Sequence, residues 1–169
     1  EDATLDVTMA ILDEAGKFAA EVLGPINKSG DREGCRIADH VVTTPTGWKD
    51  AYAAYRDGGW STVAAPNEFG GQNLAKLVAT PVQEMWQSAN LAFSLLPLLS
   101  IGAIDALART ASDEIKRKYL PKMAAGIWSG TMNLTEPQAG SDLGAVRTRA
   151  EPQTDGTYKL FGQKIFITY

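Results

Sequence analysis

The chain has 169 residues, of which 44% are hydrophobic and 21% are charged, so it is long and apolar enough to bury the core of one ordinary domain. This composition excludes a disordered chain, a collagen-like repeat and a small disulfide-stapled protein. The 16 basic and 20 acidic residues give a net charge of −4, which leaves no basic surplus to neutralise phosphates, and we expect no nucleic-acid partner.

Cysteine and histidine each occur once, at Cys35 and His40. One cysteine cannot form an internal disulfide, and these two residues cannot complete a zinc site. A single histidine also weakens any Ser-His-Asp or Cys-His catalytic scheme. We therefore expect no metal site and a reducing compartment.

The chain is predicted to begin with an amphipathic helix. Apolar residues between Leu5 and Leu23 recur at spacings of three and four, and Gly24-Pro25 is expected to end the helix. Residues 27–47 are rich in Gly, Asp, Arg, Thr and Pro, and they predict a long surface loop.

Helical segments and short connectors alternate in the middle of the chain. Aromatic residues at helical spacing predict a short helix that ends at Gly58-Gly59, and residues 65–71 predict a turn-rich connector. A further helix is expected from about Leu74 into the eighties, where Pro81 marks either a kink or the true first turn. The aromatic residues of the short helix are Trp48, Tyr52 and Tyr55.

Residues 91–108 are the most apolar stretch, with Asp105 as the only charge. A membrane span needs roughly 20 such residues. Because Pro97 and several Ser and Gly residues interrupt this stretch and Arg109 follows at once, we expect a helix buried on most sides of a bundle and no membrane span.

A last helix is predicted from its two ends. Ser112 is a suitable N-cap, and Asp113 and Glu114 place negative charge in the first turn, where the helix dipole favours it. Gly126 is suited to close the C-terminal end.

Strand patterns replace helical ones after residue 128. Residues 131–135 and 146–151 alternate in polarity, and Thr-Asp-Gly-Thr at 154–157 predicts a hairpin that pairs with residues 158–161. Residues 164–168 are β-branched and aromatic, which predicts another strand.

These patterns together predict an α+β chain. We expect an all-α helical domain at residues 1–128, followed at residues 129–169 by the first strands of an antiparallel β-barrel domain. A strand that ends a chain needs a partner. We therefore expect a fragment of a longer protein, cut inside its middle domain.

The segment Leu134–Gly144 is the strongest candidate for a ligand site. Pro137 fixes its own φ, while Gly140 accepts conformations that other residues resist. Exposed N–H groups and the hydroxyls of Thr135 and Ser141 would suit a phosphate or a polar heteroaromatic edge. On these grounds alone, a plain turn stays the simpler interpretation.

The order of residues in and after this segment is more specific than its composition. Residues 135–142 are Thr-Glu-Pro-Gln-Ala-Gly-Ser-Asp, and Asp-Gly-Thr-Tyr-Lys-Leu and Gly-Gln-Lys-Ile-Phe-Ile-Thr follow at 155–160 and 162–168. With Thr148 and Ala150, this pattern closely resembles the signature of the acyl-CoA dehydrogenase family. Matches at Gly-Trp, Phe-Gly-Gly and Tyr-Leu-Pro extend the resemblance over nearly the whole chain.

The resemblance implies a subunit of three parts: an α-domain, a middle β-domain and a C-terminal helical domain. Such enzymes hold FAD and oxidise the α,β carbon–carbon bond of an acyl-CoA to the enoyl-CoA. Their catalytic base is usually a Glu of the C-terminal domain, so we expect no catalytic residue in this chain. Glu136 is not that base, and we expect it to hold its loop by accepting backbone hydrogen bonds.

The family pattern also assigns roles to individual positions. Main-chain and hydroxyl groups of Leu134, Thr135 and Thr168 are implied to face the flavin, and Ser141 lies where flavin and the pantetheine arm of the substrate meet. Phe166 stands where many members have Trp, so it lacks the indole N–H donor. The implied cofactor-binding residues are Met132, Leu134, Thr135, Gly140, Ser141, Phe166 and Thr168.

The resemblance further implies an acyl-CoA substrate, an electron-transfer flavoprotein as electron acceptor, and a homodimer or homotetramer. Residues 30–35 and the chain end are similar to a bacterial branch that acts on 3-methylthiopropanoyl-CoA or long-chain acyl-CoA. We expect bacterial cytoplasm, with the mitochondrial matrix as an alternative. The fragment is expected to be inactive and to hold FAD weakly or not at all. An acyl-CoA oxidase relative and a non-catalytic helical interaction module stay open.

Overall fold

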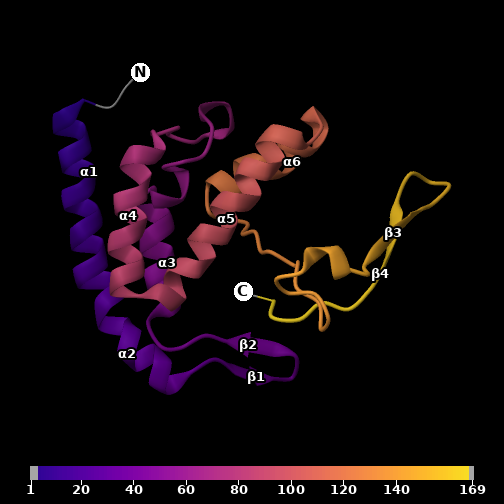
Figure 1. Cartoon of the computed structure of the whole chain (residues 1–169). Coiled ribbons are helices and arrows are strands. Elements are labelled where there is room, and N and C mark those ends of the chain that lie inside the picture. The colour runs from indigo at the N-terminus through magenta and orange to yellow at the C-terminus, as the bar shows by residue number, and fades with distance from the viewer. Residues whose placement is uncertain (1–3, 168–169) are drawn as a thin grey trace. The chain divides into compact units, whose positions relative to one another are not determined.

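The computed structural model describes residues 4–167 and divides the chain into two compact units. We refer to Glu1–Gly130 as the helical unit and to Thr131–Tyr169 as the hairpin unit. Helices dominate the first unit, and the described residues contain two antiparallel strand pairs (Figure 1). The predicted α+β class is therefore confirmed, while closure into a barrel stays a prediction.

The N-terminal helix continues past the point where the sequence predicts its end. The Gly24 N–H donates to the Ala19 carbonyl five residues back, which makes a π-helical turn. Pro25 then lies in the first turn of the next helix, where its missing N–H costs nothing. The predicted stop at Gly24-Pro25 is therefore wrong. The three parts are α1 (Leu5–Phe18), the π-turn (Ala19–Leu23) and α2 (Gly24–Glu33).

The long loop predicted at residues 27–47 is also wrong. The first of these residues belong to α2. The later ones form a hairpin of β1 (Arg36–Ala38) and β2 (Val41–Thr43), which extends away from the helices in Figure 1. Asp39 and His40 have φ values of 50° and 63°, so both occupy the left-handed region that a two-residue hairpin turn requires. Because these strands are short and fully exposed, they carry no burial pattern that a sequence analysis could detect.

The remaining helices of this unit follow the predicted order. The helix that begins at Trp48 ends at Gly58, as predicted. Pro81 lies inside the helix that begins at Lys76 rather than in its first turn. The helices are α3 (Trp48–Asp57), α4 (Lys76–Ala89), α5 (Leu91–Thr110) and α6 (Asp113–Ala124). Short 3₁₀ turns occur at Trp60–Thr62 and Asn67–Phe69.

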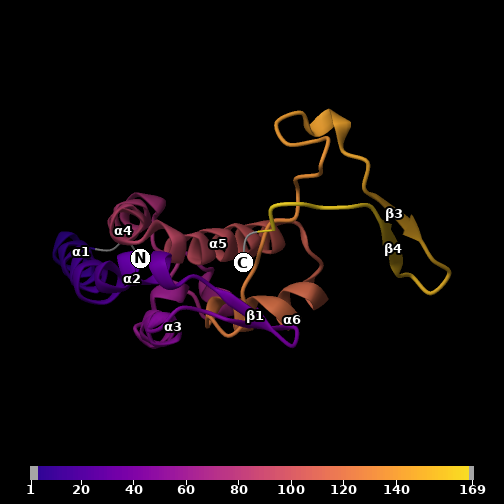
Figure 2. The same ribbon diagram turned by 90° about the horizontal axis from the view of Figure 1, so that it is seen from below.

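Aromatic side chains from α1, α3, α4 and α5 form the main core of the helical unit, and Figure 2 looks along several of these helices. The Trp86 ring meets Phe18 and Tyr55 edge to face, with centroids 5.6 Å apart in each pair. Its indole N–H donates to the Ala15 carbonyl at 3.3 Å. Burial of large rings contributes strongly to stability, so this cluster fixes how the helices pack.

Both predicted ends of α6 are confirmed. The Ser112 hydroxyl accepts from the Ile115 N–H, and Gly126 has a φ of 68°. The Gly126 and Ile127 N–H groups donate to the Met123 and Lys122 carbonyls, which is the Schellman arrangement of a helix end.

Helix α5 is less buried than the sequence predicts. By length and composition it could cross a membrane, and 28% of its most apolar window is buried. Phe93 and Leu96 are buried, whereas Leu91, Leu95 and Leu98 are exposed along one side. The expectation of burial on most sides is therefore wrong for this chain, because hydropathy shows how apolar a helix is but not which neighbours cover it.

The hairpin unit contains one of the predicted strand pairs. Strand β3 (Arg149–Pro152) pairs antiparallel with β4 (Tyr158–Phe161), and Gly156 at the turn has a φ of 82°. Residues 131–135 and 164–167 are not strands, so those two predictions are wrong. They share one hydrogen bond, from the Ile165 N–H to the Thr135 carbonyl at 3.0 Å, but not the alternating set that a ladder needs. Thr168 lies outside the described residues.

Candidate functional site

The motif segment of the hairpin unit is folded into a tight loop. The Glu136 N–H donates to the Ala139 carbonyl at 2.9 Å, and the Ala139 N–H returns a bond to the Glu136 carbonyl at 3.0 Å. Ala139 is buried, and the next residues, Gly140 and Ser141, are exposed. The loop therefore presents its small residues on the surface.

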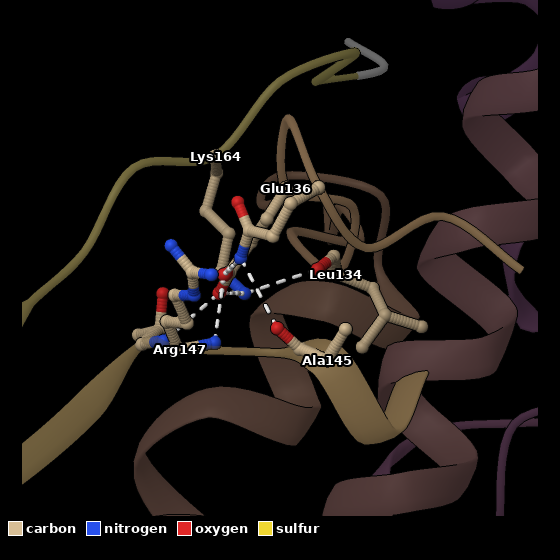
Figure 3. Close-up of polar contacts among 7 residues, drawn as sticks. Leu134, Glu136, Ala145, Arg147 and Lys164 are labelled. Carbon is tan, nitrogen blue, oxygen red and sulfur yellow. Dashed lines mark hydrogen bonds and ion pairs between the residues drawn. The ribbon is translucent and has the colours of Figure 1, made fainter. Parts of the chain in front are cut away.

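The Glu136 side chain lies at the centre of a group of polar contacts in this unit and is 2% exposed (Figure 3). One oxygen accepts the Arg147 N–H at 2.8 Å, and the other accepts the Thr148 N–H at 3.0 Å. The Lys164 ammonium forms an ion pair with it at 2.9 Å, and the Gln138 side-chain amide also donates to it. A single carboxylate thus joins three segments that are distant in sequence.

These contacts keep Glu136 ionised. Hydrogen bonds from Thr148, Arg147 and Lys164 hold the pKa of this carboxyl far below its ordinary value, although burial acts in the opposite direction. A carboxylate with so low a pKa and with its oxygens already bonded is a poor proton acceptor. The prediction that Glu136 holds its loop through backbone hydrogen bonds is confirmed.

Lys164 brings the two halves of the motif together. Its ammonium donates to the Leu134 carbonyl at 3.0 Å as well as pairing with Glu136. The neighbouring Ile165 N–H bonds to the Thr135 carbonyl. Residues 164–166 therefore lie beside residues 134–135.

The sequence-predicted cofactor residues in the described part of the chain lie mostly on the surface. Leu134 and Phe166 are 39% and 83% exposed, and Thr135 is half-buried. Met132 is exposed a few residues upstream, and Thr168 lies outside the described residues. The structure joins the Leu134–Thr135 segment to the Phe166 segment, while the cofactor roles of all these residues stay predictions.

Phe166 has an unusual backbone. Its φ is 55°, in the left-handed region that bulky residues seldom adopt. Such a conformation costs free energy, and an exposed aromatic ring gains none from burial in this chain.

Lys164 is the residue that the sequence analysis missed as a contributor to this site. Its partners Leu134 and Glu136 are 30 and 28 positions away. No local periodicity links residues at such distances, so only the tertiary structure shows their contact.

The surface formed by these segments combines exposed apolar side chains with a backbone donor. Leu134 and Phe166 supply exposed apolar surface, and among the described residues the Thr135 N–H has no hydrogen-bond acceptor. Apolar surface beside an unpaired donor suits a ring with a polar edge. Within residues 4–167, no cluster of His, Cys, Asp or Glu could hold a metal ion.

Comparison with known proteins gives consistent matches. Residues 6–127 match the family described as acyl-CoA dehydrogenase, N-terminal domain. The 3-methylmercaptopropionyl-CoA dehydrogenase of Ruegeria pomeroyi is 50% identical over 98% of this chain and 28% of its own length. The solved butyryl-CoA dehydrogenase of Megasphaera elsdenii shares the fold, with a TM-score of 0.81 and 22% identity over 99% of this chain and 42% of its own.

A second solved structure, the FAD complex of PigA, is 26% identical with a TM-score of 0.76 over 99% of this chain and 41% of its own. The present chain spans about a quarter of the length of the curated relatives it matches, at 27–28%. What these proteins share with it is therefore their N-terminal portion.

Proposed function

Because the chain belongs to the acyl-CoA dehydrogenase family, we propose that it is the N-terminal part of an FAD-dependent enzyme that oxidises the α,β carbon–carbon bond of an acyl-CoA to the enoyl-CoA. The observation that carries this proposal is the joining of the two motif segments by Lys164 and Ile165. This contact leaves Leu134 and Thr135 on one segment, and Phe166 on the segment beside it, available to a ligand.

In this proposal, Met132, Leu134, Thr135, Gly140, Ser141, Phe166 and Thr168 form one side of the FAD site. The cofactor supplies the redox chemistry, and the protein supplies orientation and electrostatics. The Thr135 N–H and hydroxyl donate toward the polar edge of the ring. The Phe166 side chain covers apolar surface without offering an N–H donor.

Substrate contact is assigned to Ser141. The tight loop exposes its hydroxyl next to Gly140, which lacks a side chain to obstruct a ligand. We propose that this hydroxyl bonds to the pantetheine arm of an acyl-CoA. The identity to the Ruegeria pomeroyi protein makes 3-methylmercaptopropionyl-CoA the first compound to test.

The chain alone is proposed to be inactive. Glu136 is committed to structural hydrogen bonds, so this motif supplies no base for the substrate Cα proton. Electrons would pass to an electron-transfer flavoprotein, or to oxygen in an oxidase relative. The complete enzyme is proposed to be a homodimer or homotetramer of the bacterial cytoplasm.

Titration of the purified chain with FAD, followed by absorbance and flavin fluorescence, tests the cofactor site. We expect weak, saturable binding that Ser141→Tyr reduces, because a bulky ring obstructs close approach to the loop. Ser29→Tyr, at an exposed position on α2, is the matched control and leaves binding unchanged. Absence of binding at millimolar FAD would contradict this part of the proposal.

A non-catalytic helical module is the second candidate, and the exposed leucines of α5 favour it. Leu91, Leu95 and Leu98 lie at helical spacing and are 37–58% exposed. Contiguous exposed apolar surface often marks a protein-protein contact. If this function holds, sedimentation shows self-association that Leu95→Lys abolishes, and FAD has no effect on the chain.

A further inference from the structure

The Leu134–Thr135 peptide has a defined orientation. Its carbonyl accepts the Lys164 ammonium at 3.0 Å. Because a trans peptide is planar, its N–H points opposite to its C=O. The Thr135 N–H is therefore directed away from Lys164, and among the described residues it has no acceptor.

The following peptide is oriented differently and is fully used. The Thr135 carbonyl accepts the Ile165 N–H, and the Glu136 N–H donates to the Ala139 carbonyl. The Thr135 N–H thus differs from the next N–H along the loop, which is already bonded. An N–H held in place without a partner is suited to bind a ligand acceptor.

Lys164 is itself firmly anchored. Its side chain is 22% exposed and pairs with Glu136, which is 2% exposed and bonded to the Arg147 and Thr148 N–H groups (Figure 3). The ammonium carries three donors, of which two are used on Leu134 and Glu136. A contact network therefore runs from the backbone at residues 147–148 through Glu136 and Lys164 to the Leu134 carbonyl.

We propose that Lys164 is a positioning residue for the cofactor site: by holding the Leu134 carbonyl, it presents the Thr135 N–H to the polar edge of the flavin. This role rests on the proposed function. In this role Lys164 does not contact the cofactor. The orientation of the Leu134–Thr135 peptide depends on Lys164, which is itself held by its ion pair with Glu136.

A purely structural role predicts something different. If Lys164 only stabilised the unit, its loss would weaken all FAD contacts of the loop together. A positioning role concentrates the loss at Thr135 and spares Ser141, whose segment is held by the separate Glu136–Ala139 backbone bonds.

The test is an FAD titration of the isotope-labelled chain followed by NMR, which detects binding even at millimolar affinity. In the unmodified chain, we expect the amide signals of Thr135, Ser141 and Phe166 to shift. Lys164→Met should lower the apparent FAD affinity roughly two- to tenfold, as expected for one hydrogen bond. The Thr135 shift should be lost while the Ser141 shift persists.

Lys159→Met is the matched control, since Lys159 is an exposed lysine on β4 of the same unit. We expect it to bind FAD as the unmodified chain does. In the absence of FAD, Lys164→Met should also move the Leu134 carbonyl-carbon signal, and Lys159→Met should not.

Each outcome is decisive. If no amide of the hairpin unit responds to FAD in the unmodified chain, the proposed cofactor site itself fails. If Ser141 and Phe166 respond and Thr135 does not, the cofactor site stands and the role of Lys164 is wrong, even if Lys164→Met fails to fold. An unchanged Thr135 response in a folded Lys164→Met variant also overturns it.

Discussion

The helical unit and the hairpin unit are stabilised in different ways. The first buries two clusters of apolar side chains, in which Leu23 and Leu120 are fully inaccessible. In the second, the buried residues among those the structure describes are Ala139 and the charged Glu136. One unit is thus organised by apolar packing and the other by a buried carboxylate with its donors.

Chain length explains this difference. A segment of about 40 residues has too much surface for its volume to bury an apolar core. Backbone N–H groups and a lysine around one carboxylate can instead fix several loops with few residues, because charge-assisted hydrogen bonds are stronger than neutral ones. The contacts around Glu136 therefore depend on this one carboxylate.

The largest effect is expected from Leu120→Ala in the helical unit. Leu120 is fully buried, so truncation leaves a cavity and should lower the free energy of unfolding by about 2–5 kcal/mol. Thermal unfolding followed by circular dichroism measures this loss. Leu77→Ala on α4, where the leucine is 87% exposed, should change it by less than about 0.5 kcal/mol. Equal effects of the two variants would contradict the described core.

Glu136→Gln should disrupt the hairpin unit specifically. The amide cannot accept at both oxygen positions and leaves Lys164 without its counter-ion. We expect amide hydrogen exchange at Arg147 and Thr148 to rise roughly tenfold or more. Exchange in α4 should stay constant, and an equal rise there would show that the two units are not stabilised separately.

The same network predicts a dependence on pH. Because Thr148, Arg147 and Lys164 lower the pKa of folded Glu136 below its ordinary value, the stabilisation is complete above that value and is lost as pH falls toward the folded pKa. The protection of the Arg147 amide against exchange, relative to the intrinsic rate at the same pH, should therefore fall below about pH 4.5. Asp155 adds an effect of the same sign, since Thr157 lowers its pKa.

The matched variant for this pH experiment is Glu136→Gln, which cannot titrate at this position. This variant should remove most of the pH dependence of amide protection at Arg147, and Asp155→Asn should remove little of it. A dependence that persists in the Glu136 variant would assign it to another group.

The smallest expected effect is that of Ser112→Ala at the start of α6. The hydroxyl accepts the Ile115 N–H, and loss of such a cap lowers stability by about 1 kcal/mol. Chemical denaturation resolves a change of this size. Ser112→Asp, which keeps an acceptor at the cap, should retain most of the stability.

Features with a local cause could be predicted from the sequence. The Ser112 and Gly126 ends of α6 and the Gly156 turn depend on neighbours within a few residues, and all three are confirmed. The family was identified from an ordered string of motif residues, and the match over residues 6–127 supports it.

Features that depend on distant partners could not be predicted in this way. The Gly24-Pro25 pair was expected to end a helix, but the helical path continues through a π-turn in which the Leu23 carbonyl accepts from the buried side chain of Asn90, 67 positions away. Residues 131–135 have the alternation of a strand, yet a strand exists only where a second segment completes its ladder.

The sequence by itself determined the family, the class of fold, the local helix and turn signals and the expectation that Glu136 holds its loop. Only the tertiary structure decided that Lys164 meets Glu136 and Leu134 and so orients the Thr135 N–H. The reason is physical, because caps and turns depend on interactions between residues that are close together in the sequence. An ion pair across 28 positions exists only once the chain has folded.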